Sequence, residues 1–201
     1  MVDAIIFDIG GVLVKHDNAL LFQRLAEHCR SVHASYLAIC DAVVNSGLRT
    51  GKQSVPEFYS VLARNFAFEG DYDTFYALWV RGIDPIPEML ALVHQLHGAY
   101  RLFIMSDTNE EHWQHVAKHY LDPTLFEDVF LSHRLGMVKP DPRLFEHVLQ
   151  AISCPPACAI FVDDTAENVT AARAFGINAC LYTSAFDFST ELARLGCTRQ
   201  T

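Results

Sequence analysis

The fold is decided by a stretch near the start of the chain, Phe7-Asp8-Ile9-Gly10-Gly11-Val12-Leu13. It follows a short apolar run, Ala4–Phe7, and joins an acidic residue to two consecutive glycines. An acid at the end of a buried strand, next to a turn that glycine makes tight, is suited to contact a ligand. Taken alone, Asp8 is equally well explained as a residue that caps the turn.

Apolar runs of similar length recur along the chain, at Leu102–Met105, Val129–Leu131, Ala159–Val162 and Ala179–Tyr182. Stretches with helical spacing lie between or beside them, at Pro87–His97, Asn109–Tyr120, Pro142–Ile152 and Glu167–Phe175. This alternation predicts an α/β fold with a Rossmann-like parallel sheet buried on both faces and flanked by helices. Because ligands bind beyond the carboxyl ends of such strands, the polar residues after each run are expected to meet in one crevice.

Between residues 17 and 84 the pattern changes, and amphipathic helical spacing dominates. Four helices are predicted there, at Leu20–Cys29, Ser35–Val44, Val55–Phe66 and Asp71–Val80. We therefore expect a core domain of residues 1–16 and 85–201, and an inserted α-helical bundle of residues 17–84 that caps the crevice. The aromatic residues between positions 58 and 79 are predicted to form the core of the cap. Residues 46–52 are predicted to form a hinge or specificity loop. Arg49 and Lys52 in this loop are candidates to contact the non-phosphate end of the substrate, although ordinary loop charges look the same.

Polar residues follow the second and fourth strand-like runs. Ser106 and Asp107 precede a predicted helix, where a hydroxyl and the helix N-terminus suit phosphate oxygens, although an ordinary N-cap looks the same. Asp163 and Asp164 are adjacent, and two like charges side by side are costly unless a cation shares the site. Carboxylate oxygens near a phosphate are typical Mg²⁺ ligands. Lys139, before another predicted helix, has the charge to neutralise phosphate, although a single lysine is usually a solvated surface residue.

The order Asp8, Ser106, Lys139 and Asp163-Asp164 resembles the four motifs of the haloacid dehalogenase superfamily. The similarity is carried by FDIGGVLV (7–14), SDTN (106–109), LGMVKPDPRLFEHVL (135–149) and FVDDTAENVTAARAFGI (161–177). The helical insertion lies where that family has its type 1 cap. These stretches are similar to the branch that contains bacterial sugar-phosphate phosphatases, such as glucose-1-phosphate phosphatase, and the N-terminal phosphatase domain of soluble epoxide hydrolase. The resemblance implies a Mg²⁺-dependent phosphatase of a small phosphorylated metabolite, with a sugar phosphate as one candidate.

The resemblance also implies roles for individual residues. Asp8 is expected to be the nucleophile and to form an aspartyl-phosphate that water later hydrolyses. Ser106 and the backbone of Asp107 are expected to bind the transferring phosphoryl group. Lys139 is expected to balance the charge between Asp8 and the phosphate.

The expected ligands of Mg²⁺ follow from the same resemblance. They are the carboxylates of Asp8 and Asp164, with Asp163 acting directly or through a water molecule. The family's backbone-carbonyl ligand falls two residues after the nucleophile, at Gly10. Asn168, four residues after Asp164, is a candidate to orient the metal-binding loop at Asp163-Asp164 through hydrogen bonds, although it equally suits the first turn of a helix.

One position departs from the family pattern. Most phosphatases of this superfamily have a second aspartate two residues after the nucleophile as general acid and base, and here that residue is Gly10. Such help is typically worth about 10²- to 10⁴-fold in rate. The similar sugar-phosphate phosphatases can also lack this aspartate, in a first motif of the DxGN kind, and Asp17 or His16 are candidates to supply the proton. Two alternatives stay open: a metal-independent 2-haloacid dehalogenase, which also lacks this aspartate, and a catalytically impaired protein that binds a phosphorylated ligand.

Composition limits the class of partner. A net charge of -9 over 201 residues argues against a nucleic-acid-binding surface. No apolar run approaches the roughly 18 residues that span a bilayer, and the N-terminus lacks the features of a signal peptide. Six cysteines without a disulfide rhythm favour a cytoplasmic setting. We expect a monomer or homodimer, and we interpret His112, His115 and His119, which share one helix side, as a solvated face rather than a zinc site.

Overall fold

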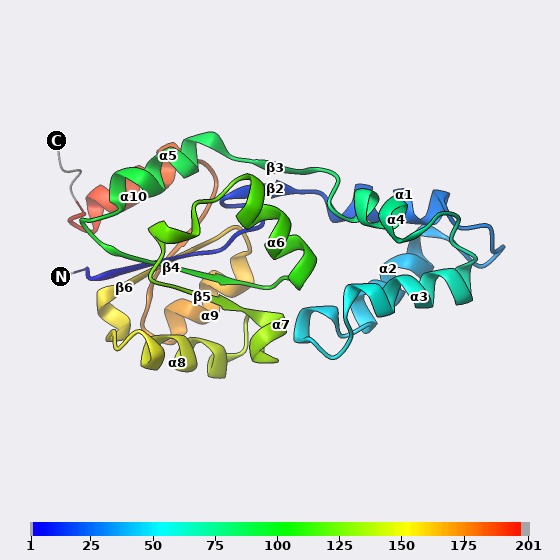
Figure 1. Ribbon diagram of the computed structural model, residues 1–201. Helices are drawn as coiled ribbons and strands as arrows, with labels where there is room; N and C mark the ends of the chain where they lie inside the picture. The colour runs from blue at the N-terminus through cyan, green and yellow to red at the C-terminus, as the bar shows by residue number, and fades with distance from the viewer. Residues whose placement is uncertain (1, 198–201) are drawn as a thin grey trace.

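A computed structural model describes residues 2–197 and shows the predicted α/β architecture (Figure 1). Met1 and residues 198–201, at the two ends of the expected core, lie outside the described residues. Five parallel strands form one sheet in the order β5-β4-β1-β6-β7. Their bounds are β1 Ala4–Phe7, β4 Arg101–Ser106, β5 Asp128–Leu131, β6 Ala159–Asp163 and β7 Asn178–Leu181. Strand β1, which Asp8 follows directly, is therefore the central one, and it pairs with β4 on one side and β6 on the other.

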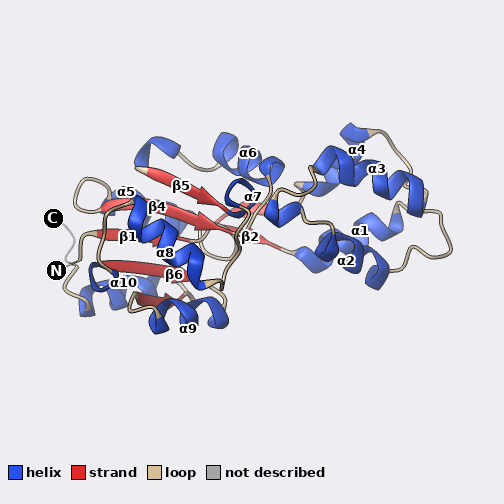
Figure 2. Ribbon diagram, turned by 90° about the horizontal axis from the view of Figure 1, so that it is seen from below, coloured by secondary structure: helices blue, strands red, loops and turns tan. Residues whose placement is uncertain are grey.

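Helices cover both faces of this sheet (Figures 1 and 2). On one face lie α5 (Pro87–Leu96), α6 (Glu110–His119) and α10 (Ala185–Arg194), and on the other α8 (Pro142–Ala151) and α9 (Ala166–Ala174). Strand β1 serves both layers: Ile5 and Phe7 pack with the first set, whereas Ala4 and Ile6 pack with the second. Because successive strand residues point to opposite faces, a strand covered on both sides is apolar throughout.

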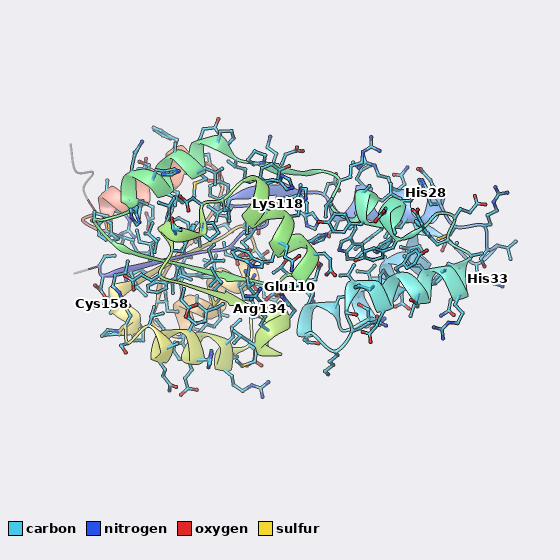
Figure 3. All side chains as sticks on the ribbon, in the orientation of Figure 1. His28, His33, Glu110, Lys118, Arg134 and Cys158 are labelled. Atoms are coloured by element: carbon cyan, nitrogen blue, oxygen red, sulfur yellow. The ribbon has the colours of Figure 1, made fainter. Side chains whose placement is uncertain are left out.

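Three short turns of 3-10 helix and one short α-helix complete the connections. They are η1 (Leu48–Thr50), η2 (Pro123–Leu125), η3 (Pro156–Cys158) and α7 (Ser132–Leu135). An ion pair ties α7 to α6: Arg134 Nη2 lies 2.9 Å from Glu110 Oε1, and both residues are labelled in Figure 3. The contact with Arg134 lowers the pKa of Glu110 to about 2, against the opposing effect of burial. This pair helps to fix the segment that leads into the loop of Lys139.

Four helices lie together beyond the carboxyl ends of the sheet strands (Figure 1). They are α1 (Asn18–Glu27), α2 (Tyr36–Asn45), α3 (Val55–Phe66) and α4 (Tyr72–Trp79). The chain enters this group through β2 (Val14–His16) and leaves it through β3 (Ile83–Pro85), which pair in antiparallel fashion. The sequence predicted the four helices but no strand in this region, because three residues are too few to show an alternating pattern.

Local sequence explains where the four helices begin. Asp17, Ser35, Ser54 and Asp71 each precede a helix and accept a hydrogen bond from a backbone N–H of its first turn. Such N-caps satisfy donors that have no partner inside the helix. At Ser54 the cap is reciprocal, since Glu57 also accepts a bond from the Ser54 backbone.

Aromatic side chains hold the helical group together, as the sequence predicted. Phe58, Phe75 and Trp79 are buried. The ring of Trp79 lies 5.6 Å from that of Phe58 and 5.4 Å from that of Phe75, centroid to centroid. Contacts of this kind are stabilising beyond the area they bury. Within residues 2–197, no helix combines the length and apolar character needed to cross a bilayer.

Candidate active site

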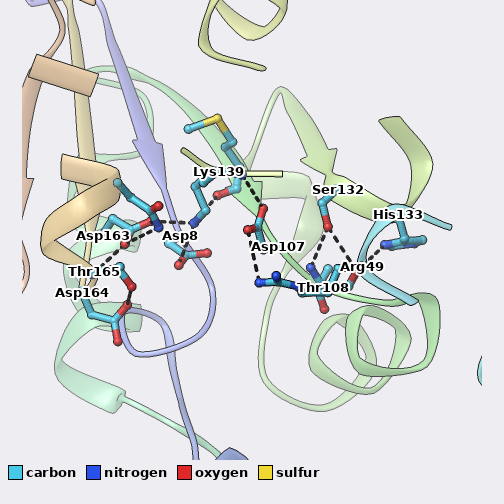
Figure 4. Close-up of polar contacts among 12 residues, drawn as sticks. Asp8, Arg49, Asp107, Thr108, Ser132, His133, Lys139, Asp163, Asp164 and Thr165 are labelled. Atoms are coloured by element: carbon cyan, nitrogen blue, oxygen red, sulfur yellow. Dashed lines mark hydrogen bonds and ion pairs between the residues drawn. The ribbon is translucent and has the colours of Figure 1, made fainter. Parts of the chain in front are cut away.

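The carboxyl ends of three neighbouring strands bring Asp8, Ser106 and Asp163 to one edge of the sheet. Lys139 reaches the same edge from the loop between α7 and α8 (Figure 4). Its Nζ atom lies 2.8 Å from Asp8 Oδ2 and 2.6 Å from Asp163 Oδ2. All four residues are buried. The structure thus brings together residues that are up to 155 positions apart, as the strand-end pattern predicted.

The carboxylate of Asp8 is held in a defined orientation. Its Oδ1 atom accepts a hydrogen bond of 2.7 Å from the Ile9 backbone N–H, and Oδ2 faces Lys139. Burial raises the pKa of Asp8 to about 6, while the positive charge of Lys139 acts in the opposite direction. The charge of Lys139 thus favours the ionised form, which a nucleophilic carboxylate requires.

Lys139 remains charged despite its burial. Removal from water favours the neutral amine, but the carboxylates of Asp8, Asp163 and Asp107 outweigh this and raise the pKa of Lys139 above its ordinary value. The backbone N–H of Lys139 also donates a 3.0 Å hydrogen bond to Asp107 Oδ1, which fixes the loop to the end of β4. The lysine is therefore a built-in cation of the site and not a solvated surface residue.

The two adjacent aspartates differ in their surroundings. Asp163 is fully buried, and it accepts hydrogen bonds from the Thr165 backbone N–H at 2.7 Å and from Asn168 Nδ2 at 3.1 Å to each oxygen, in addition to its contact with Lys139. Asp164 is exposed and accepts a bond of 3.3 Å from the Thr165 hydroxyl. Partial burial, followed by the charge of Asp163, raises the pKa of Asp164. Asp164 therefore has the more available oxygens.

Oxygens of Asp8, Asp163 and Asp164 all lie within 4.8 Å of one another. In the part of the chain that the structure describes, no other three His, Cys, Asp or Glu side chains converge in this way. Carboxylates are hard oxygen ligands of the kind that Mg²⁺ prefers, and a cation here would relieve the repulsion between them. The donor set therefore fits Mg²⁺.

The two glycines of the first motif have different surroundings. Gly11 has a φ of +75°, and a Cβ built there would lie 2.0 Å from Asp164 Oδ2, so a side chain would collide with the acidic cluster. At Gly10 a Cβ would have no heavy atom within 4 Å. Gly10 therefore borders open space, in a cavity of about 460 Å³ that also contains Asp8, Ser106 and Lys139. The missing carboxylate of the family pattern would have room in it.

Arg49 reaches this cavity from the helical group. Its Nη1 atom lies 3.8 Å from Asp107 Oδ2, and Figure 4 shows the two side chains facing one another. Burial raises the pKa of Asp107, and the charges of Lys139 and Arg49 act against that rise. Arg49 and Asp107 both line this cavity, and a contact of Arg49 with the substrate stays a prediction.

The two candidate proton donors at the start of the helical group differ. Asp17 is engaged as the N-cap of α1, where it accepts a 2.9 Å bond from the Leu20 backbone N–H. His16 lines the cavity, its Nε2 atom is buried without a hydrogen-bond partner among the described residues, and burial lowers its pKa. Of the two, His16 has the free polar atom.

The interpretation of the three histidines as a solvated face was wrong for His112. That residue is buried, and its Nε2 atom lies 2.9 Å from the Trp79 carbonyl oxygen. Its ring stacks on Trp79 at 5.2 Å and lies 5.0 Å from the His16 ring. Helical spacing predicted the helix that carries His112, but it gave no sign that the helical group of α1–α4 packs against the His112 side of that helix.

Sequence reasoning also missed a second cavity, of about 270 Å³, on the side of the helical group. Its apolar lining comes from Leu21, Phe22, Val43, Val44, Leu48 and Trp79. Apolar residues on amphipathic helices carry no signal that separates a pocket wall from a packed core. The only hint was the predicted specificity loop, which contains Leu48.

The chain matches the haloacid dehalogenase-like hydrolase family over residues 2–176. It is 36% identical over 91 residues to a drimenol cyclase of Aspergillus calidoustus (45% of this chain, 17% of that protein). It is 34% identical over 115 residues to a sesquiterpene phosphatase of Aspergillus oryzae (56% and 59%). The matches thus span less than two thirds of either fungal protein. A D-ribitol-5-phosphate phosphatase of Bacteroides thetaiotaomicron is 23% identical over 209 residues (96% and 97%).

Solved structures share the fold. A HAD family enzyme of Bacteroides thetaiotaomicron, in complex with magnesium and inorganic phosphate, has a TM-score of 0.82 at 21% identity and covers 95% of this chain and 99% of that one. An L-2-haloacid dehalogenase of Xanthobacter autotrophicus has a TM-score of 0.62 at 19% identity (96% and 83%). With the strand-end residues in place and most of its length matched, the chain belongs to the haloacid dehalogenase-like hydrolases.

Proposed function

We propose that the protein is a Mg²⁺-dependent phosphatase that hydrolyses a small phosphorylated metabolite through an aspartyl-phosphate at Asp8. The observation that carries this proposal is the convergence of three carboxylates, Asp8, Asp163 and Asp164, around one buried lysine at the ends of parallel strands. An oriented carboxylate serves as nucleophile, and the rest of the set supplies charge and position, which is most of what phosphoryl transfer needs.

Charge supports the need for a metal ion. Carboxylates at the cavity outnumber its two cations, Lys139 and Arg49. A phosphate dianion would be repelled from such a site unless a further cation were present. Mg²⁺, when bound, would neutralise charge on the transferring phosphoryl oxygens. We assign its binding to Asp8, Asp164 and the Gly10 carbonyl, and an indirect contribution to Asp163, whose oxygens already accept several hydrogen bonds.

The remaining steps use the chain's own groups. Asp8 attacks phosphorus, the bond to the alcohol oxygen breaks, and water then attacks phosphorus to release inorganic phosphate and restore the carboxylate. Ser106 and the backbone N–H of Asp107 hold phosphoryl oxygens, and Lys139 balances the charge. The departing alcohol must gain a proton. Because Asp17 caps α1, we assign this proton transfer to His16. Burial favours the neutral imidazole, and the negative charge of a bound phosphate favours the protonated form that donates. The attacking water then returns a proton to His16 in the second step.

Two other functions, a 2-haloacid dehalogenase and a non-catalytic binding protein, are distinguished from a phosphatase by the tests below. A 2-haloacid dehalogenase uses no metal, so the convergence of Asp164 with two further carboxylates would have no purpose. A binding protein would keep the site without turnover. The relatives are named for a polyol phosphate and for a sesquiterpene substrate, so they support a phosphorylated substrate and leave its alcohol open. A sugar phosphate stays one candidate.

Turnover of p-nitrophenyl phosphate tests the proposal. We expect hydrolysis by the wild type with Mg²⁺, loss with EDTA and return on adding Mg²⁺. Asp8→Asn should remove activity while the thermal transition stays cooperative, whereas Asp73→Asn, at an exposed aspartate of α4, should have no effect. Wild-type rates in Asp8→Asn would overturn the mechanism. Halide release from a 2-haloacid without metal would establish a dehalogenase, and phosphate binding without hydrolysis would establish a binding protein.

We also infer the domain organisation and setting. Residues 17–84 would form a cap on a core of residues 1–16 and 85–201, joined through the β2–β3 pair. All six cysteines are free thiols, which supports a reducing, cytoplasmic setting.

A further inference from the structure

The second cavity has a distinct chemical character. Its six apolar residues all come from the helical group, on α1, α2, η1 and α4. Its volume of about 270 Å³ lies just below the range of about 300–1,000 Å³ that is typical of small-molecule sites. An apolar wall with a few polar groups at one end is typical of sites that bind organic ligands.

This cavity adjoins the proposed catalytic one. His16, Asn18, Arg49 and Asp107 line both. A molecule whose phosphate lies beside Asp8 would therefore direct its other end past these four residues toward the apolar wall. The two cavities together form a site with a polar end and an apolar end.

Seven polar residues also line this cavity, and two of them, Asn109 and His112, are hydrogen-bonded to one another and to Trp79. Asn109 Oδ1 accepts bonds from the His112 backbone N–H at 3.0 Å and from Trp79 Nε1 at 3.4 Å. The His112 ring is hydrogen-bonded to the Trp79 carbonyl oxygen and to the Asn109 side chain. A site that selects a polyol needs free partners for several hydroxyl groups, because an unpaired buried hydroxyl is costly. At Trp79, Asn109 and His112 the polar groups already have partners, whereas the unpaired His16 Nε2 atom belongs to a residue that also lines the catalytic cavity.

One apolar residue of the wall is left in contact with water. Val44 on α2 is 62% exposed although it lines the cavity. An apolar ligand seated there would cover it, and burial of apolar surface favours binding.

We propose that this cavity is the subsite for the leaving alcohol, and that the substrate is a phosphate monoester of a compact apolar alcohol and not of a sugar or polyol. The inference rests on the proposed function for the position of the phosphate. It adds that selectivity comes from the helical group through burial of the apolar chain.

Binding of n-alkylphosphonates tests this independently of turnover. These compounds keep a phosphate-like head and cannot lose their alkyl group by phosphatase chemistry. With the Mg²⁺-loaded wild type, calorimetry should show Kd falling by up to about fourfold for each added methylene from methyl to hexyl, until the cavity is filled. A 2,3-dihydroxypropyl phosphonate should bind less tightly than n-propyl phosphonate. A Kd that is flat with chain length, or tighter binding of the diol, would overturn the proposal.

Two valine substitutions give a matched pair. Val44→Asp places a charge in the wall, and we expect it to lower the preference for hexyl over methyl phosphonate by about tenfold or more. Val32→Asp makes the same change at a position that is 94% exposed and outside both cavities, so the preference should not change. An equal effect of the two substitutions, or none at Val44, would contradict the subsite.

The two proposals fail separately. If p-nitrophenyl phosphate is not hydrolysed but the phosphonate series shows the expected gradient, the phosphatase proposal is wrong and the apolar subsite stands. If hydrolysis occurs with no gradient, the phosphatase stands and the substrate class is wrong.

Discussion

The Nζ atom of Lys139 lies 2.8 Å from a carboxylate oxygen of Asp8, and both side chains are buried at the end of the central strand. The same ammonium group contacts Asp163 at 2.6 Å. One cation thus serves two carboxylates that have little access to water. Breaking a buried ion pair by removing one partner is costly, because an uncompensated charge is left behind.

Lys139→Met should therefore affect stability as well as activity. We expect the free energy of unfolding, measured in urea without Mg²⁺ at pH 7, to fall by about 3–5 kcal/mol, with loss of phosphatase activity. Lys118→Met, at an exposed position of α6 labelled in Figure 3, is the matched control and should change stability by less than about 0.5 kcal/mol. Equal stabilities of the two variants would show that Lys139 does not compensate the buried acids.

Gly10→Asp should restore a general acid. The structure offers space for it, since a Cβ at Gly10 has no heavy atom within 4 Å. We expect kcat to rise by about 10- to 100-fold for an alkyl phosphate, whose leaving group needs a proton, and by less for p-nitrophenyl phosphate. Gly10→Asn has a similar shape without the acid and should give no rise. An equal gain in both variants would point to a cause other than proton transfer.

Asp164→Asn should weaken metal binding without unfolding the protein, because Asp164 is exposed and its carboxylate faces the other two acids. The Mg²⁺ concentration that gives half-maximal activity should increase by at least about tenfold. Asp73→Asn serves again as control. Calorimetric titration with Mg²⁺ alone checks the same shift without substrate, and an unchanged affinity would remove Asp164 from the ligand set.

His112 should make stability depend on pH. Burial lowers the pKa of His112 to about 3, from an ordinary value near 6.5. Between these values the unfolded chain binds a proton that the folded protein does not, so stability rises with pH across this window and is lost as pH falls from about 6.5 toward 3. One such group contributes a slope of at most about 1.4 kcal/mol per pH unit.

Urea denaturation of wild type and His112→Gln from pH 7 to pH 4 isolates this contribution. The His16 ring lies 5.0 Å from that of His112 and burial also lowers the pKa of His16, so the same comparison is repeated in a His16→Gln background, where His16 contributes nothing. We expect the stability difference between the two proteins to shrink as pH falls. A constant difference would show that His112 is not held neutral by the fold.

Several elements followed directly from local sequence. The observed bounds of β1, Ala4–Phe7, are those that its apolar run predicts, because a strand buried on both faces has no polar position. The four inserted helices carry their own caps and apolar periodicity. The pair β2–β3 was missed, since each strand has three residues and depends on a partner about 70 positions away for its definition.

The sequence by itself determined the α/β class, the helical insertion and the chemical identity of the site, because strand periodicity and strand-end residues are local properties. Only the tertiary structure decided that the Asp163 carboxylate is bound by Lys139 and Asn168 whereas the Asp164 carboxylate is exposed. It likewise decided that His112 is buried against Trp79. It also decided that apolar residues of four separate segments surround a cavity beside Asp107. These properties depend on long-range packing, which sets distances and burial between residues that no local pattern relates.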